Sequence, residues 1–262
     1  MNRLQPIANA DDPRISGYRN IRERDLRRRD GLCVAEGTVV LDALLRSSRF
    51  APVSLLLLRN RVAGLEGLIE RVPSGVPIYA AERDVMDAIV GFPIHRGVLA
   101  LARAATDSAI DLATIAADRI LIACGIANHD NAGGLLRVAA AFGAGAVLFD
   151  EGSADPLYRK SIRVSAGAAF TVPHTREGSI DDLLDRAAVA GWDLVALSPT
   201  GATDIGDRTF GGRTALVVGA EGPGLPATIL ERMPTARIPM AAGHDSLNVA
   251  VSAAVALYAL GR

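Results

Sequence analysis

The chain has 262 residues, half of them apolar, and a formal net charge of −1. It is long enough for two ordinary domains or one large one, and it can bury a substantial core. This balance excludes a uniformly polybasic nucleic-acid binder and a largely disordered chain.

Composition excludes several kinds of site as well. Lys160 is the single lysine among 28 basic residues, and no Gly-Lys-Ser/Thr phosphate loop occurs. The two cysteines, Cys33 and Cys124, lie far apart, which argues against structural zinc and favours a reducing compartment. The histidines show no metal-ligand spacing, and no apolar run approaches the about 20 residues of a membrane helix. The start of the chain has no apolar signal core. We therefore expect a cytoplasmic protein without a metal and without a membrane span.

Charge is unevenly distributed along the chain. Residues 1–105 carry 16 basic and 12 acidic side chains, whereas residues 106–262 carry 12 and 17. Much of the basic excess falls on a helix predicted from about residue 15 to about residue 30. This arginine run suits either a solvated helix face, which spacing alone favours, or a docking surface for a polyanion. Its arginines are Arg19, Arg22, Arg24, Arg27, Arg28 and Arg29.

Strands and helices alternate after that helix. The first half predicts strands at Leu32–Ala35, Val53–Leu58, Val76–Tyr79 and Gly97–Leu101, with helices at Thr38–Leu45, Leu65–Val72 and Arg83–Ile89. The second half predicts strands at Arg119–Cys124, Ala146–Phe149, Phe170–Val172, Asp193–Leu197, Thr214–Val218 and Ala236–Ile238, with helices at Gly133–Phe142, Pro156–Val164, Ile180–Ala190 and Leu247–Leu260. The alternation predicts an α/β fold, and the uniformly apolar strands predict a mostly parallel sheet covered on both faces.

The first candidate segment follows a predicted strand, at the strand end where α/β sheets bind ligands. Asn131 can cap the next helix, and Gly133 and Gly134 let other backbone approach closely. Arg137 lies two turns into the helix among apolar residues, where an arginine needs a partner or exposure. Spacing alone favours a helix cap and a surface arginine.

The second segment is the loop 218–225, Val-Gly-Ala-Glu-Gly-Pro-Gly-Leu. Its glycine order does not match the G-x-G-x-x-G dinucleotide fingerprint. The loop suits either a ligand held by backbone groups, with Glu221 pairing a cation such as Arg137, or a turn with a solvated glutamate.

The third segment, residues 238–249, leads into an alanine-rich helix. Ser246 can cap this helix, and Asn248 lies in its first turn, where backbone N–H groups are unpaired. His244, Asp245 and Ser246 are consecutive, but no G-x-S-x-G elbow accompanies them, so no catalytic triad is predicted. The helix suits either a core position or close packing against a partner subunit.

Together these segments resemble the SpoU family of the SPOUT superfamily, the RNA ribose 2′-O-methyltransferases. Asn131 with Arg137 six residues on is similar to the family's first motif, and the loop 218–225 is similar to its second. The third motif is matched by Ile238-Pro239-Met240 with Ser246-Leu247-Asn248-Val249, and Asp155-Pro156, Ser165, Gly167 and Pro173 also follow the pattern. The resemblance covers residues 118–262. Ala35-Glu36-Gly37 resembles the family's amino-terminal domain more weakly.

The resemblance implies an architecture. A methyltransferase domain at residues 118–262 would have an α/β fold with a mostly parallel sheet and a deep trefoil knot. A linker at 106–117 would join it to a smaller α/β RNA-binding domain at 1–105. The resemblance also implies a homodimer formed through the carboxyl-terminal domain.

The implied reaction moves a methyl group from S-adenosyl-L-methionine to a ribose 2′-hydroxyl of ribosomal or transfer RNA, without a metal. Methyl transfer is an in-line displacement, so alignment supplies much of the acceleration. Arginine is effectively always protonated, so Arg137 would hold the adjacent phosphate and stabilise the developing alkoxide, with phosphate or water as proton acceptor.

Site residues follow from the same resemblance. Asn131 and Glu221 would orient Arg137, and Ser246 and Asn248 would shape the acceptor pocket. The donor would contact Leu197, Ser198, Pro199, Thr200, Gly219, Glu221, Ile238, Met240 and Leu247. The six arginines at 19–29 would dock RNA phosphates.

Two alternatives stand beside this interpretation. One is a non-catalytic RNA-binding protein on the same scaffold, against which the complete set of Asn131, Arg137, Glu221 and Asn248 argues. The other is a nicotinamide-dependent oxidoreductase on a doubly wound sheet, which the glycine order disfavours. The amino-terminal domain favours ribosomal over transfer RNA by analogy only.

Overall fold

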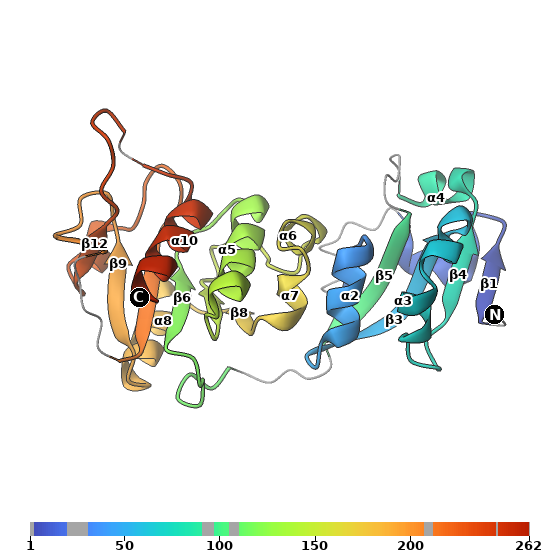
Figure 1. Ribbon diagram of the computed structural model, residues 1–262, viewed down its shortest axis with the longest axis horizontal. Helices are drawn as coiled ribbons and strands as arrows, with labels where there is room; N and C mark the ends of the chain where they lie inside the picture. Colours follow the sequence, from blue (N-terminus) through green and yellow to red (C-terminus); the bar gives the residue numbers. More distant parts are fainter. Residues whose placement is uncertain are drawn as a thin grey trace. The chain divides into compact units, whose positions relative to one another are not determined.

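The computed structural model describes residues 3–19, 31–90, 97–104, 110–206, 212–244 and 246–261 (Figure 1). The chain forms two compact units. The first comprises Met1–Asp107 and Leu157–Thr171, and the second comprises Ser108–Pro156 and Val172–Arg262. Residues 118–262 are predicted to form one domain, whereas in the structure the segment Leu157–Thr171 belongs to the first unit. The functions assigned to the two parts stay predictions.

The first unit is built on a five-stranded sheet with the order β1-β4-β3-β5-β2. Its strands are β1 (Leu4–Ile7), β2 (Leu32–Glu36), β3 (Phe50–Leu58), β4 (Ile78–Ala81) and β5 (Val98–Ala104). β4 pairs parallel with β1 and β3, but β5 pairs antiparallel with β2 and β3. The sheet of this unit is therefore mixed. β1 was not predicted.

Helices and short 3-10 turns cover this sheet. They are η1 (Pro13–Tyr18), α2 (Thr38–Arg46), η2 (Arg59–Gly64), α3 (Glu66–Glu70), α4 (Arg83–Val90), α6 (Arg159–Val164) and α7 (Ala168–Thr171). The centre of β3 forms the core of the unit, because Leu55, Leu56 and Leu57 are fully buried.

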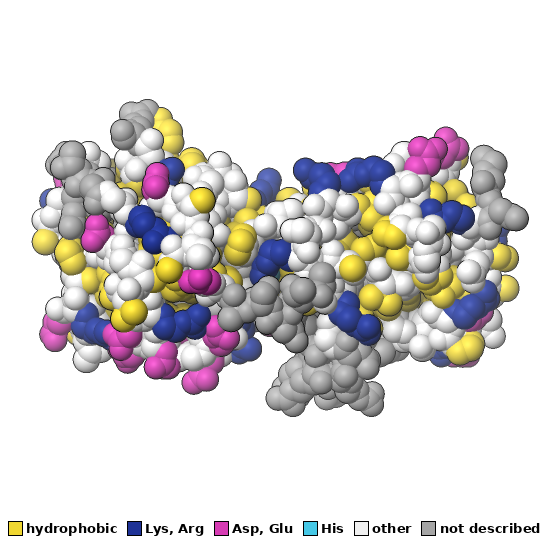
Figure 2. Space-filling view, turned by 90° about the horizontal axis from the view of Figure 1, so that it is seen from below, with side chains coloured by type: hydrophobic (Ala, Val, Ile, Leu, Met, Phe, Trp, Pro, Cys, Tyr) yellow, Lys and Arg dark blue, Asp and Glu magenta, His cyan; other side chains and the backbone are white. Residues whose placement is uncertain are grey.

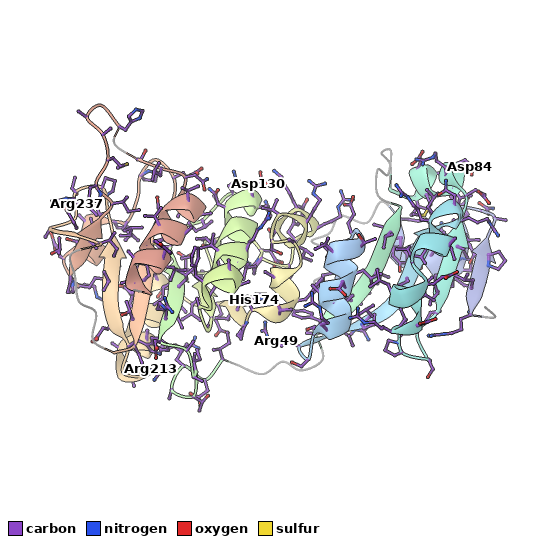
Figure 3. All side chains as sticks on the ribbon, in the orientation of Figure 1. Arg49, Asp84, Asp130, His174, Arg213 and Arg237 are labelled. Atoms are coloured by element: carbon purple, nitrogen blue, oxygen red, sulfur yellow. The ribbon has the colours of Figure 1, made fainter. Side chains whose placement is uncertain are left out.

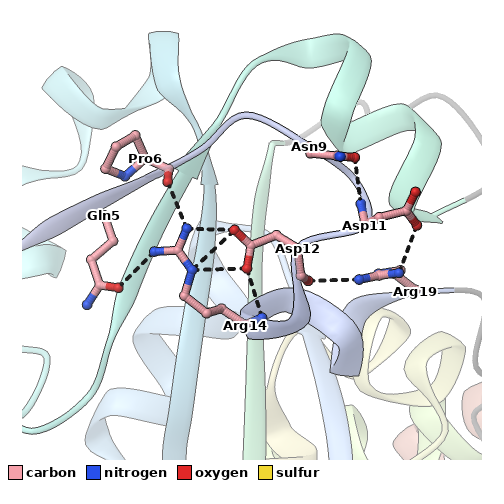
Figure 4. A network of polar contacts seen from close by, with 7 residues as sticks. All are labelled: Gln5, Pro6, Asn9, Asp11, Asp12, Arg14 and Arg19. Carbon is pink, nitrogen blue, oxygen red and sulfur yellow. Dashed lines mark hydrogen bonds and ion pairs between the residues drawn. The ribbon is translucent and has the colours of Figure 1, made fainter.

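The helix predicted from residue 15 to 30 does not form as expected where the structure describes it. Pro13–Tyr18 is a 3-10 helix, and Arg19 is already extended, with φ −85° and ψ 136°. Local polar contacts favour this end (Figure 4): Arg14 bonds the carboxylate of Asp12, and Arg19 donates to Asp11 Oδ1 at 2.9 Å and to the Asp12 carbonyl at 2.8 Å. The rest of the predicted helix lies outside the described residues.

The second unit is built on a seven-stranded sheet with the order β10-β12-β9-β11-β6-β7-β8, and all its strand pairs are parallel. Its strands are β6 (Arg119–Ala123), β7 (Val147–Phe149), β8 (His174–Arg176), β9 (Asp193–Leu197), β10 (Thr203–Asp204), β11 (Thr214–Val218) and β12 (Thr235–Arg237). This arrangement confirms the predicted α/β fold with a mostly parallel sheet. The short strand β10 was not predicted.

Helices cover both faces of this sheet. They are α5 (His129–Phe142), α8 (Ile180–Val189), α9 (Ala227–Leu230) and α10 (Val249–Leu260). In Figure 1, α5 and α10 lie side by side in front of the strands and α8 lies behind them. α5 and α10 approach closely at Gly134, where an added Cβ would lie 2.8 Å from the Cβ of Ala250. α9 was not predicted.

The predicted strand Phe170–Val172 is wrong. Ala168–Thr171 is the helix α7, and the strand β8 begins only at His174. The Phe170 ring packs edge-on against Phe50, with ring centroids 5.2 Å apart. A short apolar run is equally suited to a buried strand or a buried helix turn, so only the contacts decide between them.

The described part of the predicted linker is attached to the second unit. Arg213 lies over the Trp192 ring, 4.1 Å from its centroid. Its guanidinium donates to the carbonyls of Leu112 at 2.7 Å and Ile115 at 2.9 Å, and the Trp192 indole also donates to Leu112.

The surface shows no single-signed field on the face drawn in Figure 2, where basic and acidic side chains lie close together in both units. Ion pairs join some of these charges, since Arg46 and Arg71 of the first unit both bond Asp42. No helix among the described residues has the length and apolar content that crossing a bilayer requires.

Candidate active site

A cavity of about 340 Å³ lies in the second unit where three parallel strands end. β9, β11 and β12 bring their carboxyl ends to one edge of the sheet, and the start of α10 closes the same space. The lining residues are Leu197, Ser198, Pro199, Val218, Gly219, Ala220, Glu221, Gly222, Gly224, Ile238, Met240, Ser246, Leu247, Asn248, Val249 and Ser252.

Eight of the nine residues predicted to contact the donor line this cavity: Leu197, Ser198, Pro199, Gly219, Glu221, Ile238, Met240 and Leu247. Thr200 is not among the lining residues. Its hydroxyl lies 3.2 Å from the Ser198 hydroxyl, at an exposed turn beyond β9. The role of these residues as donor contacts stays a prediction.

Asn248 joins the three predicted motifs at the cavity. Its Nδ2 donates to Asn131 Oδ1 at 2.9 Å and to Glu221 Oε1 at 2.5 Å. Its Oδ1 accepts from the backbone N–H groups of Ala250 at 3.0 Å and Val251 at 3.4 Å. One side chain therefore caps α10 and holds the first and second motifs together.

The two helix caps differ from the predicted ones. α5 begins at His129 and is capped by Asn128, whose side chain accepts from the backbone N–H of Asp130 at 2.8 Å (Figure 3 labels Asp130 at this end of α5). Asn131 therefore lies inside the first turn, where it is buried and bonded to Asn248. α10 is capped by Asn248 instead of Ser246, which lines the cavity.

Arg137 lies apart from this cluster. It follows Asn131 by six residues, which turns it about 120° around α5. It is exposed and outside the cavity lining, and no hydrogen bond or ion pair joins it to another described residue of the chain. The predicted orientation of Arg137 by Asn131 and Glu221 is not seen within one chain, because both of these side chains bond Asn248.

Of the six arginines predicted to bind RNA, only Arg19 lies among the described residues. Its guanidinium is bonded to Asp11 and to the Asp12 carbonyl, and 30% of its side chain is exposed. Arg22, Arg24, Arg27, Arg28 and Arg29 lie outside the described residues.

A buried polar network, missed from the sequence, supports the loop that leads into α5. The Asp150 carboxylate, at the end of β7, accepts from the backbone N–H of Gly125 at 3.0 Å and from the Ser153 hydroxyl at 2.5 Å. Ser153 in turn accepts from the Ile126 N–H at 2.9 Å. Burial, together with the adjacent Asp150, raises the pKa of the Cys124 thiol to about 11. The sequence signal that could have predicted this network is Asp150 itself, an acidic residue directly after a predicted strand.

The loop 218–225 requires glycine at position 219, because a side chain there would collide with the loop's own backbone. A Cβ on Gly219 would lie 2.4 Å from the carbonyl carbon of Gly224 and 2.5 Å from the Leu225 nitrogen. Only glycine therefore lets the loop fold back on itself and form this side of the cavity. Ser252, one turn into α10, also lines the cavity and was missed because it lies beyond the third motif.

The described part of the chain contains no cluster of three or more His, Cys, Asp or Glu side chains that could hold a metal ion. The cavity is lined by apolar side chains, glycine backbone, hydroxyls, one amide and one carboxylate.

The chain is similar to known RNA methyltransferases over most of its length. The model of the SpoU rRNA Methylase family matches residues 118–258. An uncharacterized tRNA/rRNA methyltransferase of Mycobacterium tuberculosis is 38% identical over 264 residues, covering 97% of this chain and 91% of that protein. The 23S rRNA (guanosine-2′-O-)-methyltransferase RlmB of Ralstonia nicotianae is 31% identical over 191 residues, covering 71% and 76%.

Solved structures agree with the fold. A crystal structure of an RNA 2′-O ribose methyltransferase has a TM-score of 0.82 and 28% identity, covering 98% of both chains. An rRNA methyltransferase from Sinorhizobium meliloti with AdoMet bound has a TM-score of 0.81 at 22% identity, covering 98% of this chain and 97% of that one. The family match and these relatives together show that the chain belongs to the SpoU rRNA methylase family and is an RNA methyltransferase.

Proposed function

We propose that the protein transfers a methyl group from S-adenosyl-L-methionine to a ribose 2′-hydroxyl of RNA, with ribosomal RNA as the favoured substrate. The observation that carries this proposal is the bonding of Asn131 and Glu221 to Asn248 at the edge of the cavity. The relative RlmB is named as a 23S rRNA (guanosine-2′-O-)-methyltransferase, which supports both the acceptor atom and the RNA class.

The cavity residues fit this donor. Leu197, Ile238 and Leu247 provide apolar contacts for an adenine ring, and the glycine-rich loop 219–224 offers backbone groups without crowding. Glu221 supplies a negative charge for a cationic ligand. When bound, the donor supplies an electrophilic methyl group on a sulfonium.

The residues of the chain then orient the acceptor. Asn248 holds Glu221 and Asn131 in place, and Ser246 adds a hydroxyl to the cavity wall. The guanidinium of Arg137 suits the phosphate beside the reacting ribose and the oxygen charge that develops during transfer. The 2′-hydroxyl proton passes to that phosphate or to water.

A homodimer is part of the proposal. α10 carries an exposed apolar stripe at helical spacing, made of Val251, Val255 and Tyr258. Such a stripe favours burial against another subunit. Because Arg137 lies outside the cavity of its own chain, we infer that the assembled dimer is the form in which a guanidinium meets the bound RNA.

The resemblance to the SpoU family also implies a trefoil knot and a cytoplasmic location. A trefoil knot is compatible with β12 lying between β9 and β10 while the following helix α10 packs back on α5. A cytoplasmic location suits Cys33 and Cys124, which are both free thiols.

The Arg137→Ala variant tests the catalytic assignment. Methyl incorporation into 23S rRNA transcribed in vitro should be lost, while donor affinity measured by calorimetry should be retained, because Arg137 does not line the cavity. Arg186→Ala, on α8, is the matched control and should keep wild-type activity. Loss of donor affinity in Arg137→Ala would overturn the assignment. Wild-type protein that binds donor and RNA but incorporates no methyl would support the non-catalytic alternative.

A further inference from the structure

The segment Leu157–Thr171 occupies an unusual place in the fold. It lies between β7 and β8 in the chain, yet it packs within the first unit, where α6 contacts β2 and α7 contacts α2. Its sequence contains three basic residues and no acidic residue. The proposed catalytic roles use none of its residues.

The basic residues of this segment share one face of α6. Arg159, Lys160 and Arg163 fall within an arc of about 100° at α-helical spacing. Ser161 and Ile162 occupy the opposite side and are buried, whereas Lys160 and Arg163 are exposed. The helix therefore presents a positively charged face away from its own core.

The third basic residue of this segment, Arg159, lies next to the buried carboxylate of Glu36. Glu36, at the end of β2, is 6% exposed, and its Oε2 lies 3.9 Å from Arg159 Nη1. That oxygen has no hydrogen-bond partner among the described residues. A buried charge needs a nearby opposite charge, so Arg159 pairs with Glu36 and holds α6 on β2.

An aromatic side chain stands at the start of the same helix. Tyr158, the residue before α6, is 36% exposed. Among the aromatic residues that the structure describes, Tyr158 and Tyr258 are the exposed ones, and Tyr258 belongs to the apolar stripe of α10. Tyr158 is thus an exposed ring two residues before the exposed Lys160 in the chain.

We propose that Tyr158, Lys160 and Arg163 form a binding surface for an unpaired stretch of the substrate RNA. The two cations contact backbone phosphates, and the tyrosine ring stacks on a base, which is the combination that single-stranded nucleic acid requires. The inference rests on the proposed function, because it assumes that RNA is the substrate. It assigns RNA binding to a surface of the first unit.

The salt dependence of RNA binding tests the cations. Poly(U) serves as the single-stranded probe, and the Lys160→Ala/Arg163→Ala variant is compared with Arg46→Ala/Arg71→Ala, which removes the same charge from residues of the same unit that bond Asp42. Losing two phosphate contacts should reduce the slope of log affinity against log salt by about 1.4 and weaken binding about 10- to 30-fold at about 0.1 M salt. The control variant should keep the wild-type slope.

The ring is tested separately. Tyr158→Ala should weaken poly(U) binding at least about fivefold at constant salt, whereas Tyr158→Phe should bind as the wild type does, since stacking needs the ring and not the hydroxyl. Equal losses in the two variants would remove stacking from the proposal.

Donor binding and methyl incorporation separate this surface from the proposed function. The variants should bind S-adenosyl-L-methionine with wild-type affinity and keep the wild-type melting temperature. A Lys160→Ala/Arg163→Ala variant with the slope and affinity of its control would overturn the surface, even when wild-type protein methylates 23S rRNA. Loss of poly(U) binding in that variant would support the surface even if the wild-type protein incorporated no methyl group, a result that would overturn the proposed function alone.

Discussion

The side-chain amide of Asn248 donates a hydrogen bond to the side-chain oxygen Oδ1 of the buried Asn131, 2.9 Å away and 117 residues earlier in the chain. The same amide nitrogen donates to Glu221, and the other end of the side chain caps α10. The stability of a helix start and the geometry of the site thus depend on one residue, but on different atoms of it. Substitutions can therefore separate the two roles.

The Asn248→Asp variant should keep the helix cap but lose the hydrogen bonds to Asn131 and Glu221. A carboxylate still accepts from the backbone N–H groups of α10, but it cannot donate to Asn131 or Glu221, and it adds a negative charge beside Glu221. Methyl transfer should fall about 10- to 100-fold, the range for losing a hydrogen bond to a charged group. Asn248→Ala should in addition lower the free energy of unfolding by about 1 kcal/mol through the lost cap. Wild-type activity in Asn248→Asp would contradict this role.

Gly219→Ala should abolish donor binding. The added Cβ would lie 2.4 Å from the Gly224 carbonyl carbon, so the backbone of the loop must move and the cavity wall with it. Overpacking of this kind costs about 1–3 kcal/mol of stability, which leaves the protein folded for calorimetry with S-adenosyl-L-methionine. Gly206→Ala is the control, because its Cβ would meet no atom within 4 Å. Unchanged donor affinity in Gly219→Ala would show that the loop does not form the donor site.

Most of the residues that line the cavity could be predicted from the sequence, because they follow predicted strands and the carboxyl ends of parallel strands meet at one edge of the sheet. The two predicted helix caps, Asn131 and Ser246, are wrong, because Asn128 and Asn248 cap the helices instead. Asn128 and Asn131 are both good cap residues, as are Ser246 and Asn248. The choice depends on the bond between Asn131 and Asn248, which joins distant parts of the chain and leaves no local signal.

The same limit explains the errors in the fold. Phe170 lies in an apolar run too short to distinguish strand from helix, and its packing on Phe50 in the first unit decides the outcome. The alternation of elements also did not reveal that the sheet of the first unit is mixed, since the antiparallel pairing of β5 with β2 and β3 is a non-local property.

Cys124 should make the second unit less stable at high pH. Burial and the adjacent Asp150 raise the pKa of its thiol from 9.0 to about 11. Between about pH 9 and about pH 11 the unfolded chain releases this proton while the folded chain keeps it, so the free energy of unfolding falls as pH rises. Below about pH 9 both states hold the proton and the effect vanishes.

The Cys124→Ala variant should not show this part of the fall in unfolding free energy at high pH. Urea unfolding can be followed by fluorescence of Trp192, the single tryptophan, which is buried in the same unit. The difference in unfolding free energy between about pH 8 and about pH 10.5 should be smaller in Cys124→Ala than in the wild type. Equal differences in the two proteins would mean that the thiol does not titrate as its surroundings imply.

The apolar stripe on α10 should control association. Val251 and Val255 are 48% and 38% exposed in the single chain, so replacing both by aspartate should disturb the monomer little. At a subunit interface, however, the buried and unpaired carboxylates would strongly oppose association. Val251→Asp/Val255→Asp should therefore sediment as a monomer in analytical ultracentrifugation and should lose methyl transfer with the dimer.

Val189→Asp provides the matched control, because Val189 on α8 is 90% exposed and lies on the other face of the same sheet. It should leave both association and activity at the wild-type level. A wild-type protein that sediments as a monomer would contradict the proposed homodimer outright. A dimer that survives in Val251→Asp/Val255→Asp would place the interface away from α10. Arg137, on the helix α5 that packs against α10, would then need another route to the RNA phosphate.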